Sequence, residues 1–170
     1  MEAPDAGGSF LAAVDRFVDR VGRAAAWLTL AIVVLMATNV LLRYAFSIGS
    51  VWSQELEWHL LAPMVLAGMT YALSKGEHVR VDVLYASFSP RAKHVIDLIS
   101  AMLGMALSLI VIWLSIPYID QSWSIGEGSS NPGGIDARYV VKSMIPLGFA
   151  MLFLQSLAQG IRSAIAARSA

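Results

Sequence analysis

Residues 24–42 read AAAWLTLAIVVLMATNVLL, an apolar stretch without a single charged side chain. A helix needs about 20 mostly apolar residues to cross the roughly 30 Å hydrocarbon core of a bilayer. This stretch is close to that length, and three more follow at 56–73, 95–119 and 140–157. We therefore predict an all-α membrane protein that forms a single domain of residues 1–170. Its four transmembrane helices are expected over about 24–42, 54–74, 92–119 and 139–160.

The composition supports this fold class. The chain is 57% hydrophobic and 14% charged, whereas a soluble domain has about 25% charged residues. With four spans removed, too little chain is left for a second folded domain. The absence of cysteine excludes disulfides, thiolate metal sites and thiol catalysis. The net charge is zero, and we expect no nucleic-acid partner.

The distribution of basic residues predicts the orientation. Nine of the twelve Lys and Arg residues fall on one side of the four predicted spans. Because positive loops stay cytoplasmic, both termini should face the cytoplasm, with 43–55 and 120–139 on the outside. The nine are Arg16, Arg20, Arg23, Lys75, Arg80, Arg91, Lys93, Arg162 and Arg168. The three on the outer side are Arg43, Arg138 and Lys142.

The segment before the first span is expected to have two parts. Residues 1–9 are predicted to be a disordered tail, and their acidic start argues against a cleaved signal peptide. In 10–23, apolar residues recur at helical spacing and charged residues occupy the other face. This pattern predicts an amphipathic helix lying at the inner membrane surface. The alternative is a plain helical extension of the first span into the cytoplasm.

Several residues within the spans indicate helix packing. Asn39 lies in the apolar zone of the first span and needs a hydrogen-bond partner, which can be local or on a neighbouring helix. Two rows of small residues have the spacing that permits close helix contact, and Pro146 with Gly148 predicts a bend in the fourth span. The rows are Gly68, Ala72 and Gly76 in the second span, and Ser100, Gly104 and Ser108 in the third.

The sequence contains no convincing catalytic constellation. The histidines, His59, His78 and His94, fall on different sides of the predicted membrane, so they do not form one metal site. Glu55 and Glu57 begin the second span, where carboxylates suit the positive end of the helix dipole or a subunit contact. Because intramembrane carboxylates often relay protons, a coupling role remains the alternative. We expect no enzyme activity and no cofactor in this chain.

Four segments in this order, together with Gly68, carry a resemblance to a known family. NVLLRY at 39–44, WSQEL at 52–56, GEHVRVD at 76–82 and IPLGF at 145–149 resemble the small membrane subunit, of the DctQ type, of tripartite ATP-independent periplasmic (TRAP) transporters. The resemblance covers about residues 10–160. The motif residues, expected at subunit interfaces, are Asn39, Arg43, Tyr44, Trp52, Glu55, Gly68, His78, Arg80, Val81 and Asp82.

The resemblance implies a three-part system in a bacterial or archaeal cytoplasmic membrane. A periplasmic binding protein would capture an organic acid, and a large membrane subunit would carry it inward by an elevator motion driven by sodium. Sodium would therefore bind in the large subunit, and phospholipid is a candidate ligand at the subunit interface. The small subunit would enlarge the static scaffold and help to dock the binding protein, with Arg43, Trp123, Glu127 and Arg138 as docking candidates.

The resemblance also suggests contacts within the chain. Arg43 and Glu55 lie on the same predicted side and close in sequence, so we expect them to form an ion pair. His78, Arg80 and Asp82 should act at the inner surface. Two other interpretations remain open. One is a homodimeric proton-coupled exporter that uses Glu55 or Glu57. The other is a membrane-bound enzyme or electron-transfer subunit, for which the sequence lacks ligands and nucleophiles.

Overall fold

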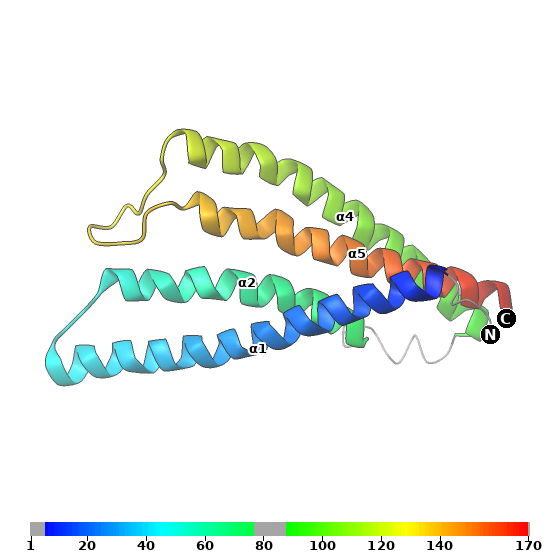
Figure 1. Ribbon diagram of the computed structural model, residues 1–170, viewed down its shortest axis with the longest axis horizontal. Coiled ribbons are helices and arrows are strands. Elements are labelled where there is room, and N and C mark those ends of the chain that lie inside the picture. The colour runs from blue at the N-terminus through cyan, green and yellow to red at the C-terminus, as the bar shows by residue number, and fades with distance from the viewer. Residues whose placement is uncertain (1–5, 77–87, 170) are drawn as a thin grey trace.

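The computed structural model describes residues 6–76 and 88–169, and in these ranges the chain forms four helices and no strand. Figure 1 shows α1 lying along α2 and α4 lying along α5, with the first residues of α1 and the last residues of α5 at the same end. His78, Arg80, Val81 and Asp82 lie outside the described residues. The helices are α1 (Ala6–Phe46), α2 (Val51–Lys75), α4 (Pro90–Ser124) and α5 (Tyr139–Ser169).

Local sequence signals explain where α2 and α4 begin and end. Ser50 caps α2, because its hydroxyl accepts a hydrogen bond from the backbone N–H of Ser53 at 3.3 Å. Ser89 caps α4 in the same way, and Pro90 follows in the first turn. Gly76 ends α2 with a φ of 74°, which glycine adopts without a steric penalty. Gly76 is therefore a helix cap here, rather than the packing residue that the small-residue row predicts.

Three of the helices, α1, α4 and α5, are long and apolar enough to cross a membrane. The second helix, α2, has 25 residues and a length of about 37 Å at 1.5 Å per residue. Its length would allow it to cross, but its first third carries Glu55, Glu57 and His59. The described fold is thus all-helical, with three candidate spans and one helix, α2, that has a polar beginning and an apolar remainder.

The N-terminal segment differs from the expectation of two separate parts. α1 runs without a break from Ala6 to Phe46, so residues 6–9 are helical and 10–23 is the first part of the same helix. The apolar face of this segment is partly used within the chain, since Val14 and Val18 are buried against Ala158 of α5. The structure therefore has one continuous helix whose first part packs on α5. A position of this part at the inner membrane surface stays a prediction.

The bundle is built with small and polar side chains inside and large apolar ones outside. α5 lies centrally and contacts α1, α2 and α4. Its buried face includes Gln155 and Ser156, and Thr70 of α2 and Ser108 of α4 are buried as well. The hydroxyls of Thr70 and Ser108 donate to backbone carbonyls of their own helices. Large apolar side chains point outward, among them Trp27, Leu103 and Trp113. This distribution suits a lipid environment, where helices associate through small residues and interhelical polar contacts.

Glycines bring α5 close to its neighbours. A Cβ atom at Gly104 would lie 2.8 Å from Ser156 Oγ, and one at Gly148 would lie 2.6 Å from Leu66 Cβ. The row of Ser100, Gly104 and Ser108 therefore contains one close contact between α4 and α5. A Cβ at Gly68 or Gly76 would meet no atom within 4 Å, so neither glycine of the first row makes a close contact with the described residues. Both Pro146 and Pro117 lie inside helices that continue past them.

Candidate functional site

The most elaborate polar site lies where α2 begins. We call this end of the bundle, with the α1–α2 connection and the 125–138 loop between α4 and α5, the loop end. Glu55 stands one turn into α2, and only 1% of its surface is exposed. A buried carboxylate is costly unless hydrogen-bond donors surround it. The surroundings of Glu55 therefore determine what this end of the bundle can do.

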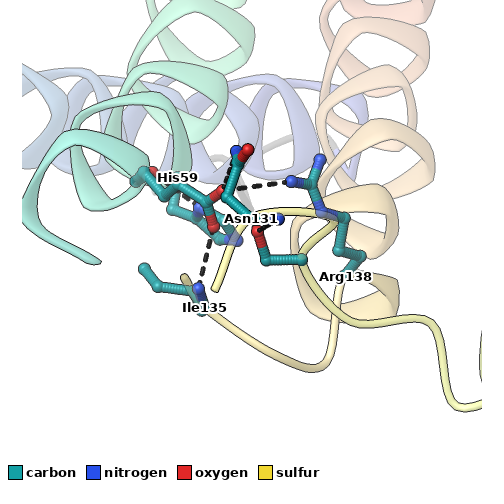
Figure 2. A network of polar contacts seen from close by, with 6 residues as sticks. His59, Asn131, Ile135 and Arg138 are labelled. Atoms are coloured by element: carbon teal, nitrogen blue, oxygen red, sulfur yellow. Dashed lines mark hydrogen bonds and ion pairs between the residues drawn. The ribbon is translucent and has the colours of Figure 1, made fainter. Parts of the chain in front are cut away.

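The 125–138 loop supplies the donors. Ser129 Oγ donates to Glu55 Oε1 at 2.5 Å, and the backbone N–H of Ile135 donates to Oε2 at 2.8 Å. Asn131 Nδ2 and Arg138 Nη2 reach Oε1 at 3.2 and 3.4 Å. Asn131, Ile135 and Arg138 meet the carboxylate within one network (Figure 2). One side chain of α2 thus holds a loop that lies more than 70 positions later in the chain.

The loop sequence allows this close approach. A Cβ atom at Gly134 would lie 2.6 Å from Glu55 Oε2 and would also collide with the Ser129 side chain. Any larger residue at this position would push the loop away from the carboxylate. Gly133 next to it has a φ of 77°, which favours glycine. The adjacent glycines are therefore needed for the contact, one for space and the other for backbone conformation.

His59 adds a contact within α2. Its Nδ1 lies 2.8 Å from the backbone carbonyl oxygen of Glu55, so Nδ1 carries the proton and donates. The i,i+4 spacing thus brings His59 to the Glu55 backbone, rather than to its carboxylate. Nε2 of the same ring is buried and has no hydrogen-bond partner among the described residues.

A second group of contacts fixes both ends of the loop. Glu127 forms an ion pair with Lys142, and the Lys142 ammonium lies 4.0 Å from the centre of the Tyr118 ring. The hydrogen bond from Lys142 lowers the pKa of Glu127 from its ordinary value. Trp123 and Tyr139 pack edge to face at 4.5 Å. These contacts join the end of α4 to the start of α5.

Asn39 connects α1 to α2 at the same end. Its Nδ2 donates to Glu57 Oε1 at 2.6 Å, and its Oδ1 accepts from Ser53 Oγ at 2.6 Å. The partners of Asn39 are thus on the neighbouring helix. An amide that is bonded at both ends fixes the rotation of α1 against α2.

The expected ion pair between Arg43 and Glu55 does not form. Arg43 is exposed and lines a hollow together with Asn39 and Glu57, while Glu55 is bonded to the 125–138 loop. The two carboxylates of α2 are two positions apart, so they project from different faces of the helix. Glu55 therefore faces the loop, and Glu57 faces α1.

The docking candidates have different surroundings. Arg138 and Glu127 are engaged in ion pairs within the chain, whereas Arg43 and Trp123 are exposed. Tyr44 and Trp52 of the motif are exposed as well. Sequence reasoning did not identify Ser129, Asn131 or Ile135 as partners of Glu55. The cluster of Ser, Asn, Pro and Gly at 128–134 signals a tight turn, but it does not indicate what the turn encloses.

The opposite end, which we call the terminal end, is joined by ion pairs. Asp19 contacts Lys75 and Arg23, each at 2.9 Å, and Asp15 pairs with Arg162. The hydrogen bond from Lys75 lowers the pKa of Asp19. These pairs connect α1 to α2 and to α5. Across the described ranges, the carboxylates and histidines form no cluster of three that could hold a metal ion.

Most of the chain matches a known protein family. Residues 32–165 match the model of the DctQ component of tripartite ATP-independent periplasmic transporters. The chain belongs to the DctQ family. The resemblance found in the sequence motifs is thereby confirmed. The family is a transporter component, which is not an enzyme class.

Two relatives of this DctQ-family chain are small permease proteins. The chain is 22% identical to the ectoine TRAP transporter small permease protein TeaB of Halomonas elongata over 135 residues, covering 77% of the chain and 69% of TeaB. It is 27% identical to the C4-dicarboxylate TRAP transporter small permease protein DctQ of Vibrio cholerae over 171 residues, covering 86% and 74%. With its membrane-spanning helices, the chain is a multi-pass inner-membrane protein and a TRAP small permease subunit.

Proposed function

We propose that this chain is the static scaffold subunit of a sodium-driven TRAP transporter for an organic acid. In this proposal α2 is a fourth span, both termini are cytoplasmic, and the loop end faces the periplasm. The chain would pack beside a large transport subunit that binds sodium, and its loop end would help to dock a periplasmic binding protein. The asymmetric distribution of basic residues supports the orientation.

The observation that carries the proposal is the fixation of the 125–138 loop by buried Glu55. An elevator mechanism needs a part that keeps its position while the cargo domain moves. Four donors on one buried carboxylate make a loop that stays in place, which suits a docking platform. The large outward-facing side chains of α1 and α4, such as Trp27 and Trp113, supply apolar surface for a membrane partner and for lipid.

The two relatives help to define what this subunit contributes. They are named for ectoine and for C4-dicarboxylates, yet both resemble the same chain at similar identity. We therefore assign substrate selection to the partners and only a structural and docking role to this chain. The exporter alternative requires a carboxylate that exchanges protons freely, and both α2 carboxylates at the loop end are hydrogen-bonded.

The test is co-purification of the tagged chain from native membranes in mild detergent, followed by mass spectrometry. We expect one large polytopic partner at a fixed ratio. A chain that purifies only with itself, and that transports solute by itself in liposomes, would overturn the proposal in favour of an exporter.

A second measurement addresses docking. Glu55→Gln should keep the large partner at its normal ratio but weaken uptake that depends on the binding protein. Asp120→Asn, which changes an exposed acidic residue near the same end, is the matched control. If Glu55→Gln leaves the uptake rate unchanged at limiting binding protein, the docking role of this loop is wrong.

A further inference from the structure

A hollow of about 290 Å³ opens on the side of α1 and α2 at the loop end. Its polar lining comprises Asn39, Arg43, Gln54 and Glu57, and its apolar lining includes Met36 and Val40. Met36 and Val40 precede Arg43 by about two turns and one turn of α1. Polar groups therefore lie beside the helix ends, and apolar groups extend from them toward the middle of the bundle.

The hollow has both signs of charge. Arg43, in the last turn of α1, brings a guanidinium, and Glu57 brings a carboxylate. Within residues 6–76 and 88–169 these two groups do not form an ion pair with each other or with another charged side chain. Two opposite charges that line one hollow without touching can each bind a group of opposite sign on one ligand.

A hydrogen bond from Asn39 fixes the position of the Glu57 carboxylate. Asn39 donates to Oε1 at 2.6 Å and is itself fixed by Ser53. Among the described residues, Asn39 is the one group bonded to this carboxylate, so Oε2 remains for another donor. Hydrogen bonding of this kind orients a binding group before the ligand arrives.

We propose that this hollow binds the head group of a zwitterionic aminophospholipid. The Arg43 guanidinium binds the lipid phosphate, since its planar fork matches phosphate oxygens. Glu57 accepts from the primary ammonium, and Gln54 lies where it can donate to a phosphate or ester oxygen. An acyl chain follows Met36 and Val40 toward the bilayer centre. The proposal concerns this chain alone and does not depend on the scaffold function.

The charges also predict which lipids are disfavoured. A phosphatidylglycerol head group would satisfy Arg43, but it offers Glu57 neutral hydroxyls and no cation, so its negative charge remains unbalanced beside the carboxylate. A choline head group has no N–H to donate, so its contact with Glu57 lacks a hydrogen bond. Selection for phosphatidylethanolamine over phosphatidylglycerol and phosphatidylcholine is therefore the signature of the site.

The experiment is native mass spectrometry of the full chain in detergent, titrated with these three lipids carrying identical acyl chains. We expect phosphatidylethanolamine adducts to dominate. Glu57→Gln should lower their equilibrium constant about tenfold, the ratio for one lost charge-assisted hydrogen bond, but should not weaken phosphatidylglycerol binding. Arg43→Gln should weaken both. Glu57→Gln keeps an oxygen for Asn39, so this variant should fold.

The matched controls are Arg20→Gln and Asp120→Asn, which remove the same charges from exposed positions away from the hollow. Both should bind lipid as the unmodified chain does. Equal binding of the three lipids, or an unchanged preference in both hollow variants, would overturn the proposal. Hollow variants that keep the lipid preference but no longer co-purify with the large partner would also overturn it and assign the hollow to a protein contact.

Discussion

The two ends of this bundle are held by different chemistry. At the loop end, buried Glu55 accepts hydrogen bonds from four groups of one segment. At the terminal end, Asp15 and Asp19 form ion pairs whose side chains remain partly exposed. Exposed ion pairs contribute little and are screened by salt, whereas removal of a buried partner leaves several groups unsatisfied. The loop end should therefore be rigid, and the terminal end adaptable.

The largest effect is expected when the carboxylate of Glu55 is removed from the loop end. Glu55→Ala leaves Ser129, the Ile135 N–H and Arg138 without their shared acceptor, so the loop should detach. We expect trypsin cleavage after Arg138 to accelerate about tenfold or more, since at least one charge-assisted hydrogen bond is lost. Asp15→Ala, the matched change at the terminal end, should leave this rate unchanged. Equal acceleration in both variants would contradict the contrast between the ends.

A second effect tests the space around Glu55. Gly134→Ala places a methyl group where the carboxylate and Ser129 already lie, so it should destabilise the chain by about 1–3 kcal/mol. The midpoint of thermal unfolding in detergent measures this change. Gly49→Ala, at a glycine where an added methyl group would meet no atom within 4 Å, is the control. A larger loss for Gly49→Ala would disprove the crowding argument.

A third prediction concerns the pH dependence of the Glu127–Lys142 ion pair at the loop end. The pKa of Glu127 is lowered in the folded chain because Lys142 donates to it. Its stabilising contribution is therefore complete above the ordinary carboxyl pKa of 4.5 and is lost as pH falls below that value, through the lowered pKa. Glu127→Gln should flatten the fall in unfolding temperature over this acid range. A profile identical to that of the unmodified chain would argue against a stabilising pair.

The smallest expected effect lies at the terminal end. Asp19→Asn removes the charge that pairs with Lys75 and Arg23, but these exposed cations can be solvated instead. We expect the unfolding temperature in 0.15 M salt to stay within measurement scatter, because exposed ion pairs of this kind contribute little to stability. A clear fall in unfolding temperature that persists at high salt would mean that the ion pairs of the terminal end stabilise the fold as strongly as the Glu55 contacts of the loop end.

The sequence predicted the helices better than their contacts. Length and apolar character are properties of each segment alone, so the three candidate spans could be identified from them. The family was identified from the four motif segments and their order. Asn39 could be expected to need a partner, because an amide in an apolar zone is costly without one. The prediction of an Arg43–Glu55 ion pair was wrong because proximity in sequence does not determine how a helix is rotated about its axis. Glu55 and Glu57 point to different neighbours for that reason.

The loop contacts could not be predicted for a different reason. Ser129, Asn131 and Ile135 reach Glu55 across more than 70 positions, and one of the three contacts uses a backbone N–H, which has no side-chain signature. The close approach at Gly22 was also missed, where a Cβ atom would collide with the Tyr71 ring. By contrast, the amphipathic pattern could not show that Val14 and Val18 pack on α5, because a protein surface and a membrane surface favour the same pattern.

The central place of α5 has a consequence for biosynthesis. This helix, which contacts every other described helix, is synthesised after the three helices that it contacts. The pair of α1 and α2 can form early, but α4 reaches the membrane before the helix that joins it to that pair. The hydrogen-bond donors to Glu55 likewise lie in the 125–138 loop, which is synthesised much later than Glu55. Completion of the fold thus depends on the synthesis of α5, and a nascent chain stopped before residue 139 would lack the element that connects its two halves.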